Sequence, residues 1–283
     1  MAVAVLPIFL LVASSLPVAA RLEGERAVEQ ARYAFVIGAT RPFDEAYPRA
    51  LFERRVAREG AEEEVLKRAF GLEPTPEVLA AEYDRIEKTT KDPDQWHAIK
   101  AALGDDRGTI EEVFCRPLVV SRALRARFAF DQAIHSEPHE NARKARALFL
   151  AGQSPPEAQR VKVRLGGDGE LPSTETLLAA AKAEAGTGPR VLTTPSPPPA
   201  DAPEIASPEV GAVLDKQLRA PGDVTTILEE RDQFEVYKLV ERGKDVLTVE
   251  VVRVPKRNFE EWFAAVRAQP TVGAASESPD LTR

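Results

Sequence analysis

Residues 234–254 read FEVYKLVERGKDVLTVEVVRV, and this stretch decides the fold class. Apolar and β-branched side chains alternate with polar ones on both sides of Arg242-Gly243-Lys244, a pattern typical of two strands joined by a tight turn. The sequence therefore predicts a short antiparallel sheet in the C-terminal half of the chain.

The rest of the C-terminal half is predicted to contain both helices and strands. Its other expected elements are a strand over 161–165, a turn over 166–169, helices over 174–185 and 208–218, a short strand over 225–228 and a last helix capped by Asn258. Six prolines lie within residues 195–208. Because proline removes backbone donors and favours extended conformations, we expect 195–208 to be an insertion without regular structure.

The N-terminal half is predicted to be helical. Helix starts are expected at Thr75-Pro76, at Asp92-Pro93 and at a capping box formed by Thr109 and Glu112. The helix after that box is expected to run to about Ile134, with Pro117 kinking or splitting it. Glycines are expected to end the earlier helices, and a final helix should cover 139–150.

These patterns together predict an α+β fold, with a mainly helical N-terminal domain followed by a small α+β domain. Helical spacing also predicts that one core contains five side chains, namely Trp96, Leu103, Val120, Leu124 and Phe128.

Composition excludes several classes of protein. The chain has 283 residues, of which 43% are hydrophobic and 29% charged, so it is neither a multi-span membrane protein nor a fully disordered chain. Its net charge of −7 argues against sequence-independent nucleic-acid binding. Its single cysteine, Cys115, excludes an intramolecular disulfide and cysteine-rich zinc sites.

Residues 1–20 read MAVAVLPIFLLVASSLPVAA and carry no charged side chain. An apolar run followed by Val18-Ala19-Ala20 is typical of a cleaved export signal. An uncleaved membrane anchor is the alternative, although the segment reaches spanning length only by including serines and prolines. We therefore expect an exported protein, periplasmic or at the extracytoplasmic membrane face, with possible membrane attachment through residues 1–20.

Candidate chemical groups are sparse. His135 and His139 are four residues apart, but a third metal ligand is not evident, so we expect solvated histidines at a turn between helices. Cys115 is expected to be a small buried side chain. The arginines of the long helix, at positions 116, 122, 125 and 127, are expected on its wetter sides, where they could line a peptide cleft or be ordinary surface. No phosphate loop, nucleophile elbow or paired-carboxylate motif is present, so we assign no catalytic residue, metal or cofactor.

The order of helical signals carries a first resemblance. Gly71-Leu72-Glu73-Pro74-Thr75-Pro76-Glu77-Val78 precedes a helix, a short helix ends in Ala101-Ala102-Leu103-Gly104, and a long Arg/Leu-rich helix follows Thr109. Over roughly residues 30–135, this order resembles the N-terminal chaperone region of the SurA/PrsA/PpiD group of bacterial foldases.

A second resemblance covers Leu214 to Glu241. Leu218, Gly222-Asp223-Val224-Thr225 and Val236–Val240 are similar to the closing helix, turn and strand of a parvulin prolyl-isomerase domain. The family's first strand carries a histidine, and the nearest match here, Ala145–Phe149, has Ala147 in that place and has a helical pattern. The resemblance is thus to a degenerate parvulin domain.

Together the resemblances imply a helical domain over 21–152, a parvulin-like domain over 153–268 with the insertion 195–208, and a disordered tail over 269–283. They imply a holdase chaperone that binds unfolded exported polypeptides, with low isomerase activity. An active prolyl isomerase and a non-catalytic cell-envelope interaction protein are the alternatives. The substrate-binding residues implied are Phe234, Val236 and Tyr237 in the parvulin-like part and Arg122 and Arg125 in the helical part.

Overall fold

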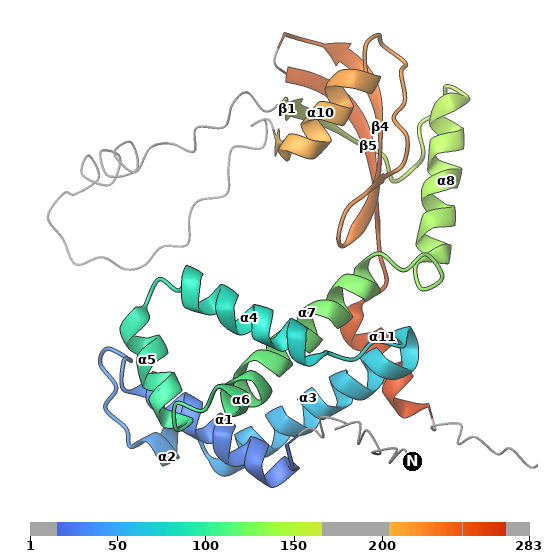
Figure 1. Ribbon diagram of the computed structural model, residues 1–283. Coiled ribbons are helices and arrows are strands. Elements are labelled where there is room, and N and C mark those ends of the chain that lie inside the picture. Colours follow the sequence, from blue (N-terminus) through green and yellow to red (C-terminus); the bar gives the residue numbers. More distant parts are fainter. Residues whose placement is uncertain (1–15, 166–203, 245, 270–283) are drawn as a thin grey trace, which may run out of the picture. The chain divides into compact units, whose positions relative to one another are not determined.

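The computed structural model describes residues 16–165, 204–244 and 246–269 (Figure 1). Its fold is α+β, and the chain divides into two compact units. Unit 1 takes the described residues up to Ala129 together with those from Asn258 onward, and unit 2 is Phe130–Arg257. The described residues contain no helix that is both long and apolar enough to cross a membrane.

Unit 1 consists of helices. They are α1 (Val18–Tyr33), α2 (Phe43–Ala46), α3 (Arg49–Phe70), α4 (Pro76–Thr89), α5 (Pro93–Ala102), α6 (Arg107–Ile110), the π-helical turn η1 (Glu111–Cys115), α7 (Arg116–Ala129) and α11 (Phe259–Ala268). The predicted helix starts before Pro76 and Pro93 are confirmed, and the Asp92 side chain accepts from the Gln95 N–H at 3.0 Å. Gly71 ends α3 with φ of 65°, a left-handed conformation that favours glycine.

The prediction of a capping box at Thr109 is wrong. The Oδ1 atom of Asp106 instead accepts from the Thr109 N–H at 2.7 Å, so Asp106 is the cap and the helix begins at Arg107, three residues earlier than a Thr109 cap would place it. Aspartate is the stronger cap because its ionised side chain complements the positive helix N-terminus. The helix also ends at Ala129 rather than near Ile134.

Pro117 is accommodated by η1 rather than by a break. A proline ring clashes with the carbonyl four residues before it, which here belongs to Val113 within η1. The Arg116 N–H donates to the Glu111 carbonyl, five residues back, so the turn before the proline is widened. The helix therefore runs on from η1 into α7.

The apolar interior of unit 1 is divided, which corrects the single core expected from the sequence. Trp96 and Leu103 belong to one cluster with Val28 of α1, whereas Val120 and Leu124 belong to another with Phe263 of α11. Each of the five predicted core side chains is buried.

The C-terminal helix α11 packs on α3 and α7, so it belongs to unit 1. Asn258 caps it as predicted, accepting from the Glu260 and Glu261 N–H groups. The compact units thus differ from the expected segments 21–152 and 153–268: α11 is part of the first unit and the helix before the sheet is part of the second.

Unit 2 is a sheet with helices. Its elements are α8 (Ser136–Leu150), β1 (Gln159–Arg164), β2 (Glu204–Ile205), α10 (Pro208–Gln217), β3 (Leu228–Glu229), β4 (Gln233–Arg242) and β5 (Val246–Pro255). The strand order is β2-β1-β5-β4-β3, with β2 parallel to β1 and the other pairs antiparallel. The predicted hairpin is therefore confirmed as β4–β5.

Two predictions for this unit need correction. Residues 195–208 are not wholly irregular, because 204–205 pair with Val163 and Arg164 as β2 and Pro208 begins α10. Residues 195–203 of that insertion, the helix predicted over 174–185 and the turn predicted over 166–169 lie outside the described residues. The short strand is formed by Leu228–Glu229 and shares only Leu228 with the predicted 225–228.

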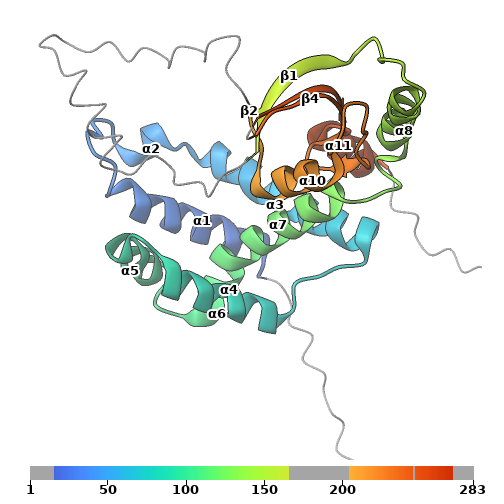
Figure 2. The same ribbon diagram turned by 90° about the horizontal axis from the view of Figure 1, so that it is seen from above.

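The two faces of the sheet are covered by different helices (Figures 1 and 2). Val210, Leu214 and Leu218 of the α10 segment pack on one face, over side chains that include Tyr237 and Leu239. Ala145 and Phe149 of α8 pack on the opposite face, over Val236 and Val252. Alternation along β4 sends neighbouring side chains to opposite helices.

Candidate functional site

An open groove of about 480 Å³ runs along α8 in unit 2. Its α8 lining residues are His139, Arg143, Arg146, Ala147 and Leu150, which recur at helical spacing. Thr226 and Ile227, just before β3, form the opposite wall. We call this feature the α8 groove.

The α8 groove lies beside the buried stripe of the same helix. Each buried residue of this stripe directly precedes a groove residue in the sequence. The buried residues are Pro138, Ala142, Ala145 and Phe149. One stripe of α8 therefore packs on the sheet and the adjacent stripe is open to a ligand.

The apolar part of the groove is supported from below. Leu150 is 60% exposed, and Ile227 is half-buried on the cluster of Ala145, Phe149 and Val236. An apolar ligand side chain placed over Leu150 and Ile227 would cover surface that is now hydrated, which favours binding. The packing of Ile227 on buried side chains of α8 and the sheet holds this surface in place.

Three α8 side chains that line the groove are held by a hydrogen bond, an ion pair and a ring contact. Arg146 donates from Nε to the Thr225 carbonyl at 2.8 Å, which ties α8 to the segment before β3. Arg143 pairs with Glu140, one turn earlier on α8, at 3.3 Å. The His139 ring meets the Phe234 ring edge-to-face at 5.3 Å between centroids.

A second pocket, of about 340 Å³, opens on the α10 face of the same sheet. Its floor contains Glu235, which is buried and accepts hydrogen bonds from Tyr237 Oη at 2.7 Å, Gln233 Nε2 at 2.7 Å and Arg253 Nε at 3.2 Å. Burial, and then the hydrogen bond to Glu235, raises the pKa of the Tyr237 phenol. These contacts satisfy the buried Glu235 carboxylate and make this network part of the sheet's structure.

The three strand residues expected to bind substrate do not share one surface. Val236 is fully buried beneath the α8 groove, and the Phe234 ring packs against the His139 ring. Tyr237 lines the pocket on the opposite face. None of the three lines the α8 groove, although two of them support it.

Arg122 and Arg125 lie in unit 1 and are held in ion pairs. Arg122 donates to both carboxylate oxygens of Glu82, at 2.8 and 3.1 Å. Hydrogen bonds from Arg85 and then from Arg122 lower the pKa of Glu82 to about 2. Arg125 lies over the Phe259 ring at 4.3 Å and pairs with Glu260 of α11. These arginines join helices of unit 1.

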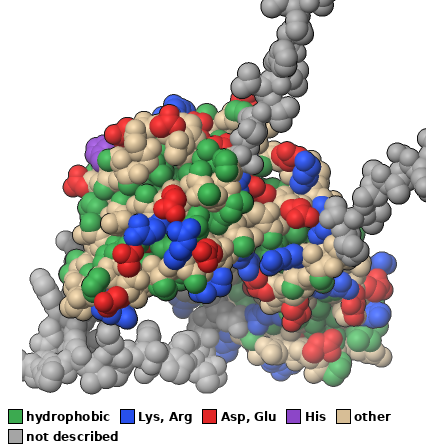
Figure 3. All heavy atoms as spheres, turned by 90° about the horizontal axis from the view of Figure 1, so that it is seen from below, with side chains coloured by type: hydrophobic (Ala, Val, Ile, Leu, Met, Phe, Trp, Pro, Cys, Tyr) green, Lys and Arg blue, Asp and Glu red, His purple; other side chains and the backbone are tan. Residues whose placement is uncertain are grey.

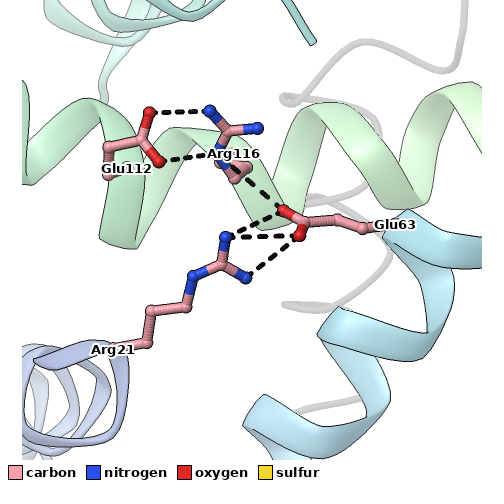
Figure 4. A network of polar contacts seen from close by, with 4 residues as sticks. All are labelled: Arg21, Glu63, Glu112 and Arg116. Carbon is pink, nitrogen blue, oxygen red and sulfur yellow. Dashed lines mark hydrogen bonds and ion pairs between the residues drawn. The ribbon is translucent and has the colours of Figure 1, made fainter. Parts of the chain in front are cut away.

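Arg116, expected on a wetter side of the helix, is buried in a polar network (Figure 4). It donates to both oxygens of Glu112 at 2.7 Å, and its Nε lies 3.8 Å from Glu63. The guanidinium of Arg21 in α1 also donates hydrogen bonds to both carboxylate oxygens of Glu63, at 3.2 Å. The network joins α1, α3 and the η1–α7 helix and pairs two guanidinium groups with two carboxylates, whereas the buried Nε of Arg21 makes no hydrogen bond within the described part of the chain.

Two further expectations can be compared with the structure. His135 is buried rather than solvated, and its Nδ1 accepts from the Arg257 N–H at 3.3 Å, whereas His139 is exposed as expected. Cys115 is buried, as predicted, and burial raises the pKa of its thiol to about 12. Among the residues that the structure describes, no three His, Cys, Asp or Glu side chains are grouped so as to hold a metal ion.

The sequence analysis did not identify the α8 groove. A signal for it was present, because 139, 143, 146, 147 and 150 form one stripe that ends in an apolar residue. That stripe could not be distinguished from ordinary surface until the opposite wall at 226–227 was known.

Comparisons of the chain with protein-family models, with curated proteins and with solved structures found no significant match, so the resemblances noted above rest on the quoted residues alone.

Proposed function

We propose that this chain is a folding factor that acts outside the cytoplasm and holds unfolded polypeptides in the α8 groove. The observation that carries the proposal is the groove itself, an open surface in which Leu150 and Ile227 offer apolar area beside polar and basic walls. Such a surface suits transient binding of an unfolded segment, because it buries an apolar side chain without a deep, shape-specific pocket.

Two local features support the foldase resemblance behind this proposal. In unit 1, Gly71 and Gly104 both have positive φ at helix ends, and the chaperone-like pattern has glycine at these two places, in its glycine-led turn and at its short helix ending in Leu-Gly. In unit 2, α10 leads through a turn into the antiparallel strands β3 and β4, and Asp223 closes that turn by accepting from the Arg219 and Ala220 N–H groups. This is the order of helix, turn and hairpin on which the parvulin-like resemblance rests.

The parvulin-like part of the proposal concerns binding more than catalysis. Ala147, the residue nearest to the family histidine in the sequence, lies on helix α8 rather than on a strand. It lines the groove without a group that could polarise a proline amide. We therefore expect little acceleration in a proline-limited refolding assay, and robust acceleration at catalytic concentrations would favour the isomerase instead.

The test is suppression of aggregation of reduced, denatured lysozyme, followed by light scattering. The wild-type chain should suppress scattering at near-stoichiometric concentrations, and Leu150→Asp should lose most of this effect. Leu148→Asp is the matched control, because Leu148 is on the same helix and 36% exposed but does not line the groove. Failure of the wild-type chain to suppress scattering, or equal loss in both variants, would refute the proposal.

A further inference from the structure

The charged side chains that line the α8 groove, Arg143 and Arg146, are both basic. The titratable lining residues of the groove are His139, Arg143 and Arg146, and no carboxylate lines it. This contrasts with the net charge of −7 of the whole chain. Figure 3 shows that acidic and basic side chains are interspersed on the face of the molecule that it presents.

The arginines of the groove are placed to receive a ligand carboxylate. Arg143 and its partner Glu140 are 65% and 51% exposed at their side chains, so their ion pair is weak and readily exchanged. Arg146 is fixed at the wall by its bond to the Thr225 carbonyl. A guanidinium held in this way can pair with a carboxylate in a defined geometry.

From this arrangement we infer that the α8 groove selects polypeptide segments in which a carboxylate lies near an apolar side chain. The inference rests on the proposed function and names its substrate class. The apolar side chain would cover Leu150 and Ile227, and the carboxylate would pair with Arg143 or Arg146.

The helix geometry sets the spacing that the ligand needs. Along α8, Arg146 and Arg143 precede Leu150 by four and seven residues, which corresponds to about 6 and about 10 Å at ~1.5 Å per residue. A peptide in the β conformation advances about 3.3 Å per residue and places side chains two apart on one side. A peptide in the polyproline II conformation advances about 3.1 Å per residue and places side chains three apart on one side. A carboxylate two or three residues from the apolar side chain therefore matches the groove.

The experiment measures fluorescence anisotropy of three labelled peptides with the full-length chain. The peptides share one apolar core and differ only at the position three residues away, which is Glu, Gln or Lys. Affinity should follow the order Glu, Gln, Lys, with about a two- to fivefold step between Glu and Gln, the range expected for an exposed ion pair. The step should shrink at 0.5 M salt, because screening weakens exposed pairs.

Variants assign the selection to the groove. Arg143→Gln should weaken binding of the Glu peptide about two- to fivefold and leave the Gln peptide unchanged. Lys144→Gln removes the same charge from the next position of α8, which does not line the groove, and should leave the order intact. Leu150→Ser should weaken all three peptides alike.

The outcomes separate this inference from the proposed function. Equal affinity for the three peptides, with Leu150→Ser still weakening them, would overturn charge selection and leave the holdase intact. Equal effects of Arg143→Gln and Lys144→Gln would show that the net charge of the unit, and not the groove, sets the order. Absence of binding of every peptide would remove the proposed function and the inference together.

Discussion

Substitution of Leu124 by alanine tests the packing of unit 1 most directly. Leu124 is fully buried among Val65 and Leu66 of α3, Val120 of α7 and Phe263 of α11. Leucine to alanine removes three carbon atoms, which corresponds to about 2.4 kcal/mol of transfer free energy at ~0.8 kcal/mol per methylene. Because three helices form the walls, the site can collapse only in part, and a residual cavity of about 50 Å³ would add about 1 kcal/mol.

We therefore expect Leu124→Ala to lower the free energy of unfolding of unit 1 by about 3–4 kcal/mol. Urea unfolding followed by tryptophan fluorescence is the assay. The two tryptophans of the chain, Trp96 and Trp262, both lie in unit 1, so their emission reports on that unit. Trp262 is on α11 and also reports release of that helix.

The matched control is Leu118→Ala. Leu118 is on α7 as well but is 41% exposed, so truncation there should cost less than about 1 kcal/mol. If the two variants lost similar stability, or if Leu124→Ala lost less than about 1 kcal/mol, the assignment of α11 to the core of α3 and α7 would be wrong.

Two further predictions concern polar groups of unit 1. Burial, and then the charge of Glu25, raises the pKa of Glu59 to about 8, so the folded state binds this proton more tightly than the unfolded state does. The contribution of the protonated Glu59 carboxyl to the free energy of unfolding is fully present below the ordinary carboxyl pKa and is lost as pH rises through about 8. In urea unfolding, Glu59→Gln should therefore stabilise unit 1 by at least about 1 kcal/mol at pH 8.5 and should not stabilise it at pH 4. Asp106→Ala should lower unit 1 stability by about 0.5–2 kcal/mol through loss of the helix cap, whereas Thr109→Ala should cost clearly less; the reverse order would restore the capping box at Thr109.

Elements with strong local signals were predicted well from the sequence. The hairpin β4–β5 has alternating side chains over both strands, and α11 has an asparagine cap followed by an apolar face. In each case the signal that forms the element lies within the element itself. Local signals of this kind need no tertiary context.

Elements that depend on distant partners were predicted poorly. Residues 204–205 become a strand because the edge of β1 offers hydrogen bonds to them, although the proline-rich sequence around them suggests none. The apolar face of α11 indicates that the helix needs a partner, but sequence order placed it with the sheet and the structure places it on α3 and α7. The accommodation of Pro117 likewise depends on a widened turn that begins at Glu111.

The division of α8 into two stripes makes the proposed site separable from the fold. Phe149, in the buried stripe, is 1% exposed, and its truncation would cost about 3–5 kcal/mol. Leu150 is the next residue but faces the groove, where a substitution should change stability by no more than about 0.5 kcal/mol. Arg143 is similarly exposed at its side chain. Loss of binding in the groove variants, at unchanged stability, would therefore reflect contacts with the polypeptide and not damage to the sheet that supports the groove.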